Sequence, residues 1–240
     1  MTTGTTSMLA VSAGPFIAGC DSATDPMCEP DETPAHSITL PAFRIDATEV
    51  TQAEYRDCIE ARACSAPYHG PTPWEGEACV HAWDPEARPA RAVTCVSWAQ
   101  ASAFCAWAGK RLPTETEWEK AARGTDGRVF PWGSAAADCT RVSMEGCLGD
   151  VAQHSSGRSP YGAWDMAGGA WEWTASWYSA ALWKDVKNEA RGGPEHGEFR
   201  VVRGCELNAL HASARDVRAA NRFSLAPEHA AVRLGFRCAK

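Results

Sequence analysis

At 240 residues, the chain has room for one large domain or two small ones with a substantial buried core. Its 30 acidic and 23 basic residues give a formal net charge of −7, which disfavours nucleic acid and anionic membranes as partners. No apolar run approaches the ~20 residues that a membrane-spanning helix needs. Acidic residues lie among the C-terminal arginines, so we expect those arginines to form structural ion pairs or to be exposed to solvent.

The N-terminal stretch "LAVSAGPFIAG" (9–19) predicts two short strands around a turn. Its end overlaps "IAGC" (17–20), which is similar to a lipoprotein cleavage box. We reject that interpretation because nothing basic precedes the box and Pro15 interrupts a short apolar run. If the protein is exported, we expect its signal to have been removed from this sequence. Four further strands are expected at Ser37–Leu40, Ala42–Ile45, Phe199–Arg203 and Gly235–Cys238.

Three capping boxes predict three helices, because each box satisfies two otherwise unpaired N–H groups at a helix start. The boxes are Thr51/Glu54, Ser97/Gln100 and Thr114/Glu117, and the helices should end near Glu60, Gly109 and Gly124. With 20 glycines and 15 prolines, most of the remaining chain should be turns and long loops. We therefore predict an α+β fold with few regular elements, in a single domain spanning residues 1–240.

Eleven cysteines are too many for a typical cytosolic protein and indicate disulfides in an oxidising, extracytoplasmic compartment, as in a secreted, periplasmic or surface protein. The absence of any C-x-x-C disfavours a zinc ribbon or a thioredoxin-type site. Local bridges are expected at Cys20–Cys28, Cys58–Cys64, Cys139–Cys147 and Cys79–Cys95. The odd count leaves a thiol that is free or paired between chains, and we expect it to be Cys205.

Six stretches together resemble the formylglycine-generating enzyme, or sulfatase-modifying factor, family. They are "FRIDATEVTQAEY" (43–55), "VSWAQASAFCAWAGKRLPTETEWEKAARG" (96–124), "FPWG" (130–133), "YGAWDMAGGAWEWTASWY" (161–178), "RVVRG" (200–204) and "LGFRCA" (234–239). The resemblance covers nearly the whole chain and implies a variant C-type-lectin-like fold with small antiparallel sheets and long ordered loops. It also implies a disulfide between Cys105 and Cys238.

Oxidases of that family hold copper(I) on two cysteines that follow an R-G-G-S-W turn, and soft thiolates suit Cu(I). The corresponding turn here is "RGCEL" (203–207), and the two thiol positions fall on Ala209 and Ala214. An alanine methyl group cannot bind copper, so no copper is expected. Cys205 lies four positions before the first expected thiol and has no second cysteine near it in sequence. We interpret it as a buried or cross-linked cysteine, and we assign no catalytic residue.

Other catalytic chemistry has little support in the sequence. Relatives that form sulfur–carbon bonds use an iron held by three histidines on a separate helical domain, which this sequence lacks. The seven histidines show neither H-x-x-x-H nor H-E-x-x-H spacing. No G-x-S-x-G is present to support Ser/His/Asp hydrolysis.

The motif "DMAGGAWEW" (165–173) offers oxygen ligands for a calcium ion. The resemblance implies a structural Ca²⁺ held by the carboxylates of Asp165 and Glu172 and by the carbonyls of Gly168 and Ala170, and such a mixed oxygen set suits Ca²⁺. Gly169 is a departure, because the family usually has asparagine there. The alternative is that Asp165 caps a turn and Glu172 pairs with an arginine.

The C-terminal loops suit ligand recognition, because motif residues bracket a chemically mixed set of side chains. That set is Asn208, Leu210, His211, Phe223, Ser224, Leu225, His229, Val232 and Arg233. We predict a non-catalytic module that binds a protein or a small molecule through these loops. The arrangement also resembles the variable region of diversity-generating retroelement proteins. The alternative is a formylglycine-generating or related oxidase with altered active-site chemistry.

Overall fold

The computed structural model describes residues 6–70, 79–142, 149–184, 192–204 and 216–240. Its helices are α1 (Gln52–Glu60), α2 (Trp98–Trp107) and α3 (Glu115–Arg123), with short 3-10 helices at Cys79–His81, Ser155–Gly157 and Leu182–Lys184. Its strands are β1 (Met8–Val11), β2 (Gly14–Ala18), β3 (His36–Leu40), β4 (Phe43–Asp46), β5 (Trp171–Trp177), β6 (Arg200–Gly204), β7 (Phe223–Leu225) and β8 (Leu234–Gly235).

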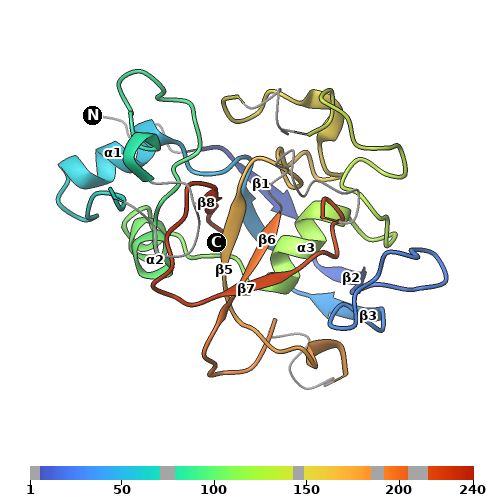
Figure 1. The fold of residues 1–240 in the computed structure, drawn as a ribbon. Coiled ribbons are helices and arrows are strands. Elements are labelled where there is room, and N and C mark those ends of the chain that lie inside the picture. The colour runs from blue at the N-terminus through green and yellow to red at the C-terminus, as the bar shows by residue number, and fades with distance from the viewer. Residues whose placement is uncertain (1–5, 71–78, 143–148, 185–191, 205–215) are drawn as a thin grey trace.

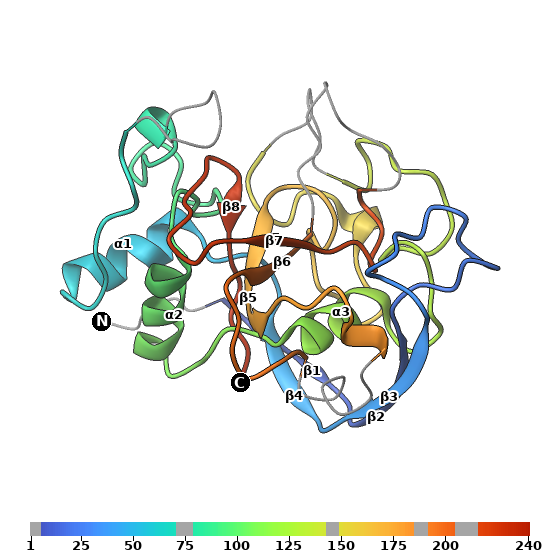
Figure 2. The same cartoon turned by 60° about the horizontal axis from the view of Figure 1, so that its bottom comes forward.

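The strands form three small sheets (Figure 1). Two are antiparallel pairs, β1 with β4 and β2 with β3, and the third has four strands in the order β7-β6-β5-β8. Within the third sheet β5 and β8 are parallel, and the other pairs are antiparallel. Helices α1 and α2 lie to one side of this sheet and α3 lies to the other, as Figures 1 and 2 show. The predicted α+β class is confirmed.

All three capping boxes are present, and the helices start where the sequence predicts. The side chains of Thr51, Ser97 and Thr114 accept the N3 backbone N–H groups at 3.3, 3.3 and 3.2 Å. No helix in the described part of the chain is both long enough and apolar enough to span a membrane.

The strand predictions are less accurate than the helix predictions. The two N-terminal strands, β1 and β2, exist, but they pair with β4 and β3 instead of with each other. Strand β8 covers only Leu234–Gly235, so Phe236–Cys238 are wrongly predicted to be strand. Strand β7 occupies Phe223–Leu225, which we predicted to be loop, because it forms backbone pairs with β6 at the edge of the sheet.

Helix α3 has a polar sequence, yet every one of its residues is buried. Its acids are paired with arginines of the C-terminal region: Glu115 accepts two bonds from Arg222 at 2.7 and 2.9 Å, and Glu119 accepts one from Arg203 at 2.9 Å. Both arginine side chains are fully buried. These pairs anchor the end of β6 and the start of β7 against the helix. Arg203 and Arg222 do form structural ion pairs, but with acids of α3 and not with the acids that lie among the arginines in sequence, and neither is exposed.

Four of the predicted disulfides lie within the described residues: Cys20–Cys28, Cys58–Cys64, Cys79–Cys95 and Cys105–Cys238. The last of these joins α2 to the C-terminal segment, with a Cα–Cα distance of 5.6 Å. Cys139 is also disulfide-bonded. Its predicted partner, Cys147, lies outside the described residues, as does Cys205.

Candidate functional site

A cavity of about 390 Å³ lies beside the N-terminus of α1. Its walls come from four parts of the chain: residues 49–52, 81–94, 149–170 and 232–233. This volume is in the range of small-molecule binding sites. The cavity brings together residues from the predicted calcium motif (Asp165 and Ala170) and from the predicted recognition set (Val232 and Arg233).

Two buried carboxylates, Glu49 and Asp165, line the cavity, and we call them the acid pair. Backbone hydrogen bonds hold the chain next to Glu49, because Val50 donates to Phe236 and accepts from Val93. Burial raises the pKa of Glu49 well above its usual range, and the charge of Asp165 raises it further. Burial also raises the pKa of Asp165. Within the described residues, Oε2 of Glu49 has no hydrogen-bond partner.

Glu172, one of the predicted calcium ligands, is hydrogen-bonded to other side chains. Its two oxygens accept bonds from Nε and Nη2 of Arg237, each at 2.7 Å, and Oε2 also accepts from Trp118 Nε1 at 2.9 Å. Glu172 therefore has the arginine partner of the alternative interpretation. Asp165 has a left-handed φ of 54°, and its Oδ2 accepts the backbone N–H of Ala152 at 2.7 Å.

Arg237 offsets the charge of Glu172, but among the described residues Oε1 of Glu172 accepts only one hydrogen bond and keeps an acceptor site. Calcium binding through Asp165, Glu172 and the carbonyls of Gly168 and Ala170 stays a prediction, and we treat Ca²⁺ below as a rival occupant of this region.

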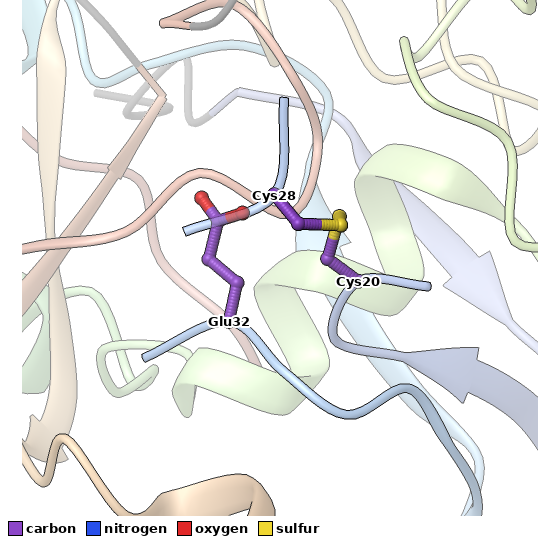
Figure 3. A group of neighbouring side chains, drawn as sticks. All are labelled: Cys20, Cys28 and Glu32. Atoms are coloured by element: carbon purple, nitrogen blue, oxygen red, sulfur yellow. A yellow bond between two sulfur atoms is a disulfide. The ribbon is translucent and has the colours of Figure 1, made fainter. Parts of the chain in front are cut away.

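One group of three potential metal ligands occurs among the described residues: Cys20, Cys28 and Glu32 (Figure 3). The two sulfur atoms are bonded to each other, and Glu32 accepts two hydrogen bonds from Arg218 at 2.6 and 2.8 Å. A disulfide offers no thiolate, and a carboxylate paired with arginine offers no free charge. We therefore interpret this group as a structural link between residues 20–32 and the C-terminal region.

The predicted recognition residues are only partly brought together. Phe223 is 53% exposed, and its ring lies 5.8 Å from that of Trp171. Ser224 and Leu225 are half-buried on the same strand. His229 is buried, and burial lowers its pKa, so placing it on an exposed recognition patch is wrong. Three more members of the set, Asn208, Leu210 and His211, lie outside the described residues.

Trp171 connects the cavity to this exposed surface. Its backbone N–H donates to Arg233, a cavity residue, at 2.8 Å, and its Cα is paired with Gly204 at the end of β6. Its ring contacts Phe223. Trp171 therefore lies between a residue of the cavity wall, Arg233, and the exposed Phe223.

Glu49 was missed from the sequence. The pattern there predicts a strand followed by a capped helix, and an acid two positions before the N-cap Thr51 is unremarkable in such a segment. The local signal in "ATEVT" (47–51) is weak, because Glu49 lies between Thr48 and Val50. Only the fold shows that this acid faces Asp165.

Replacing Phe223 with alanine should cost less than about 1 kcal/mol of unfolding free energy, because its exposed ring contributes little to the core. Phe236 is the matched control: it is fully buried, and its truncation should cost ~3–5 kcal/mol. Urea unfolding of both variants measures the difference. Equal losses would show that Phe223 belongs to the core and not to a free surface.

Glu49→Gln should stabilise the protein at neutral pH. Because the folded-state pKa of Glu49 is raised, its contribution to stability is complete below the unfolded pKa of about 4.5 and is lost as the pH rises through the folded pKa. Glutamine cannot ionise, so the variant avoids the cost of a charged carboxylate at this buried position. Urea unfolding from pH 4 to pH 8 should show a gain for the variant that grows with pH. A variant that is less stable than the wild type at pH 8 would contradict this.

The model of the family described as "Sulfatase-modifying factor enzyme 1-like domain" matches residues 2–240. Hercynine oxygenase of Mycolicibacterium smegmatis is 34% identical over 81% of this chain, which spans 52% of that relative. Formylglycine-generating enzyme of Streptomyces coelicolor is 32% identical, covering 87% of this chain and 81% of the relative. Inactive C-alpha-formylglycine-generating enzyme 2 of Mus musculus is also 32% identical, covering 97% and 85%.

Solved structures share the fold. PvdO from Pseudomonas aeruginosa is 25% identical, with a TM-score of 0.79 over 97% of this chain and 93% of that one. Treponema denticola variable protein 1 is 22% identical, with a TM-score of 0.72 over 100% and 97%. The expected formylglycine-generating-enzyme type of fold is thereby confirmed.

Proposed function

Since the chain belongs to the sulfatase-modifying factor enzyme 1-like family, we propose that it is a non-catalytic member that binds a protein or small-molecule ligand. The ligand site in this proposal is the cavity together with the Trp171–Phe223 surface. Because the described disulfides are typical of oxidising compartments, we also propose an extracytoplasmic location.

The shortage of thiols carries this proposal. Nine of the eleven cysteines lie in the described residues, and all nine are in disulfides. Eight of them pair with one another, so Cys139 takes its partner from the two remaining cysteines. At most one thiol is then left in the chain. A two-thiolate copper(I) site of the kind the oxidases use needs two, and Ala209 and Ala214 supply neither.

Two further observations support binding. The cavity is of ligand size and has charged residues of both signs on its walls. An exposed phenylalanine beside it, Phe223, offers apolar contact area of the kind that anchors partners. A relative whose name describes it as inactive resembles this chain over 97% of its length, so loss of chemistry is compatible with the family's sequence pattern.

A copper(I) titration against a competing chelator tests the proposal. The chain should bind no stoichiometric copper, whereas the Streptomyces coelicolor enzyme, run in parallel, provides the reference for an active relative. The alternative is an oxidase with altered chemistry, and it is supported by relatives whose names describe enzymes. Stoichiometric copper binding that is lost on Cys205→Ser would favour the alternative and would refute the binding role as the sole function.

A further inference from the structure

The acid pair indicates what kind of ligand the cavity takes, on the premise that the cavity is the binding site proposed above. Glu49 and Asp165 are 2% and 8% exposed. Arg237 is committed to Glu172 through two hydrogen bonds of 2.7 Å and comes no nearer to Glu49 Oε2 than 3.9 Å, which is beyond hydrogen-bond distance. Within the described residues, therefore, no cation is hydrogen-bonded to the acid pair. Oε2 of Glu49 is thus a buried carboxylate oxygen with no hydrogen-bond donor among the described residues, and a charged donor would bind it well.

Gly169 leaves room for such a group. It lines the cavity with Glu49, and its φ of +82° is in the left-handed region. A Cβ at this position would lie 3.0 Å from Glu49 Oε1 and would meet no other atom within 4 Å. Any larger side chain would therefore cover this oxygen. Because residue 169 is glycine, its position adds no side chain that would cover Oε1 of Glu49.

The same cavity also carries positive charge. Arg88, Arg91 and Arg233 line it and are half-buried, whereas the acid pair is buried. The acid pair is thus more buried than the three arginines, and one exposed acid, Asp150, also lines the cavity. Guanidinium groups bind carboxylates well, so the part of the cavity that the arginines line suits an anionic group.

We propose that the cavity binds a small zwitterion, with its ammonium group against Glu49 beside Gly169 and its carboxylate toward the arginines. The ammonium group donates the hydrogen bond that Oε2 of Glu49 lacks among the described residues. Gly169 is the specificity-determining residue, because the space above it admits the ammonium group. A free ω-amino acid is such a zwitterion, with its two charges at opposite ends of the carbon chain.

Calorimetric titration of the EGTA-treated full chain with 6-aminohexanoate tests the proposal. We expect binding to the wild type, and binding at least tenfold weaker for N-acetyl-6-aminohexanoate, which lacks the ammonium charge, and for n-hexylamine, which lacks the carboxylate. Glu49→Gln and Gly169→Asn should each weaken binding of 6-aminohexanoate at least tenfold. Asparagine tolerates a left-handed φ better than most residues, so the Gly169→Asn variant keeps its backbone conformation.

Glu60→Gln is the matched control. It removes the same charge from a side chain that is 70% exposed at the end of α1, and it should leave the affinity unchanged. The proposal is overturned if the wild type does not bind 6-aminohexanoate, or if the Glu49 and Gly169 variants bind it as well as the wild type does. Calcium that binds stoichiometrically and displaces the probe also overturns it, in favour of a metal. None of these results bears on copper, so the titration in the preceding subsection decides separately between a binding protein and an oxidase.

Discussion

Arg237→Met should lower the free energy of unfolding by ~3–5 kcal/mol, which is the cost of removing one partner from a buried ion pair. Arg237 is fully buried and gives two hydrogen bonds to Glu172, which has no exposure of its own. Without the arginine, Glu172, Glu49 and Asp165 would be three buried carboxylates in one region. Urea unfolding at pH 7 measures the loss, and the melting temperature should fall with it.

Two variants show whether the loss comes from the unpaired charge. Glu172→Gln combined with Arg237→Met should recover part of the stability, because glutamine is neutral and its oxygen can still accept from Trp118. The surface pair Arg128–Asp126 is the matched control: its side chains are 29% and 56% exposed, and Arg128→Met should cost only ~0–1 kcal/mol. Equal losses from Arg128→Met and Arg237→Met would show that burial does not set the cost.

Removing the Cys105–Cys238 disulfide by a double alanine substitution should cost ~2–5 kcal/mol. This bridge joins residues 133 positions apart, so it restricts the unfolded chain more than the local bridges do. The Cys58–Cys64 bridge spans only 6 positions and is the matched control. Its removal should cost less in guanidinium unfolding. A larger loss from removing the short bridge would contradict the chain-entropy explanation.

The sequence predicts the helices well because capping is local. Thr51, Ser97 and Thr114 each meet a partner three residues away, so no knowledge of the tertiary fold is needed. The strands depend on distant pairing, which explains why the length of β8 and the existence of β7 were mispredicted. The burial of α3 is likewise invisible from its polar sequence, since two of its acids, Glu115 and Glu119, pair with arginines more than 80 residues away.

In the candidate site, too, some residues could be predicted from local sequence and others depend on the tertiary fold. The motif around Asp165 was found from the sequence, and that residue does line the cavity. Which arginine pairs with Glu172 could not be predicted, because Arg237 lies 65 positions further along the chain. Glu49 was missed for a similar reason: its significance depends on Asp165 and Gly169, which are brought to it only by the fold. His229 was assigned to the surface because a loop position alone does not reveal burial.

The most direct test of the binding role is mass spectrometry of a sulfatase-type cysteine peptide incubated with the protein, copper(I), a reductant and oxygen. The account predicts that the cysteine stays unconverted, because the chain has at most one thiol and alanines at the two copper positions, Ala209 and Ala214. The Streptomyces coelicolor enzyme serves as the reference under the same conditions. Conversion of the peptide cysteine to an aldehyde by the wild type, abolished by Cys205→Ser, would contradict the account.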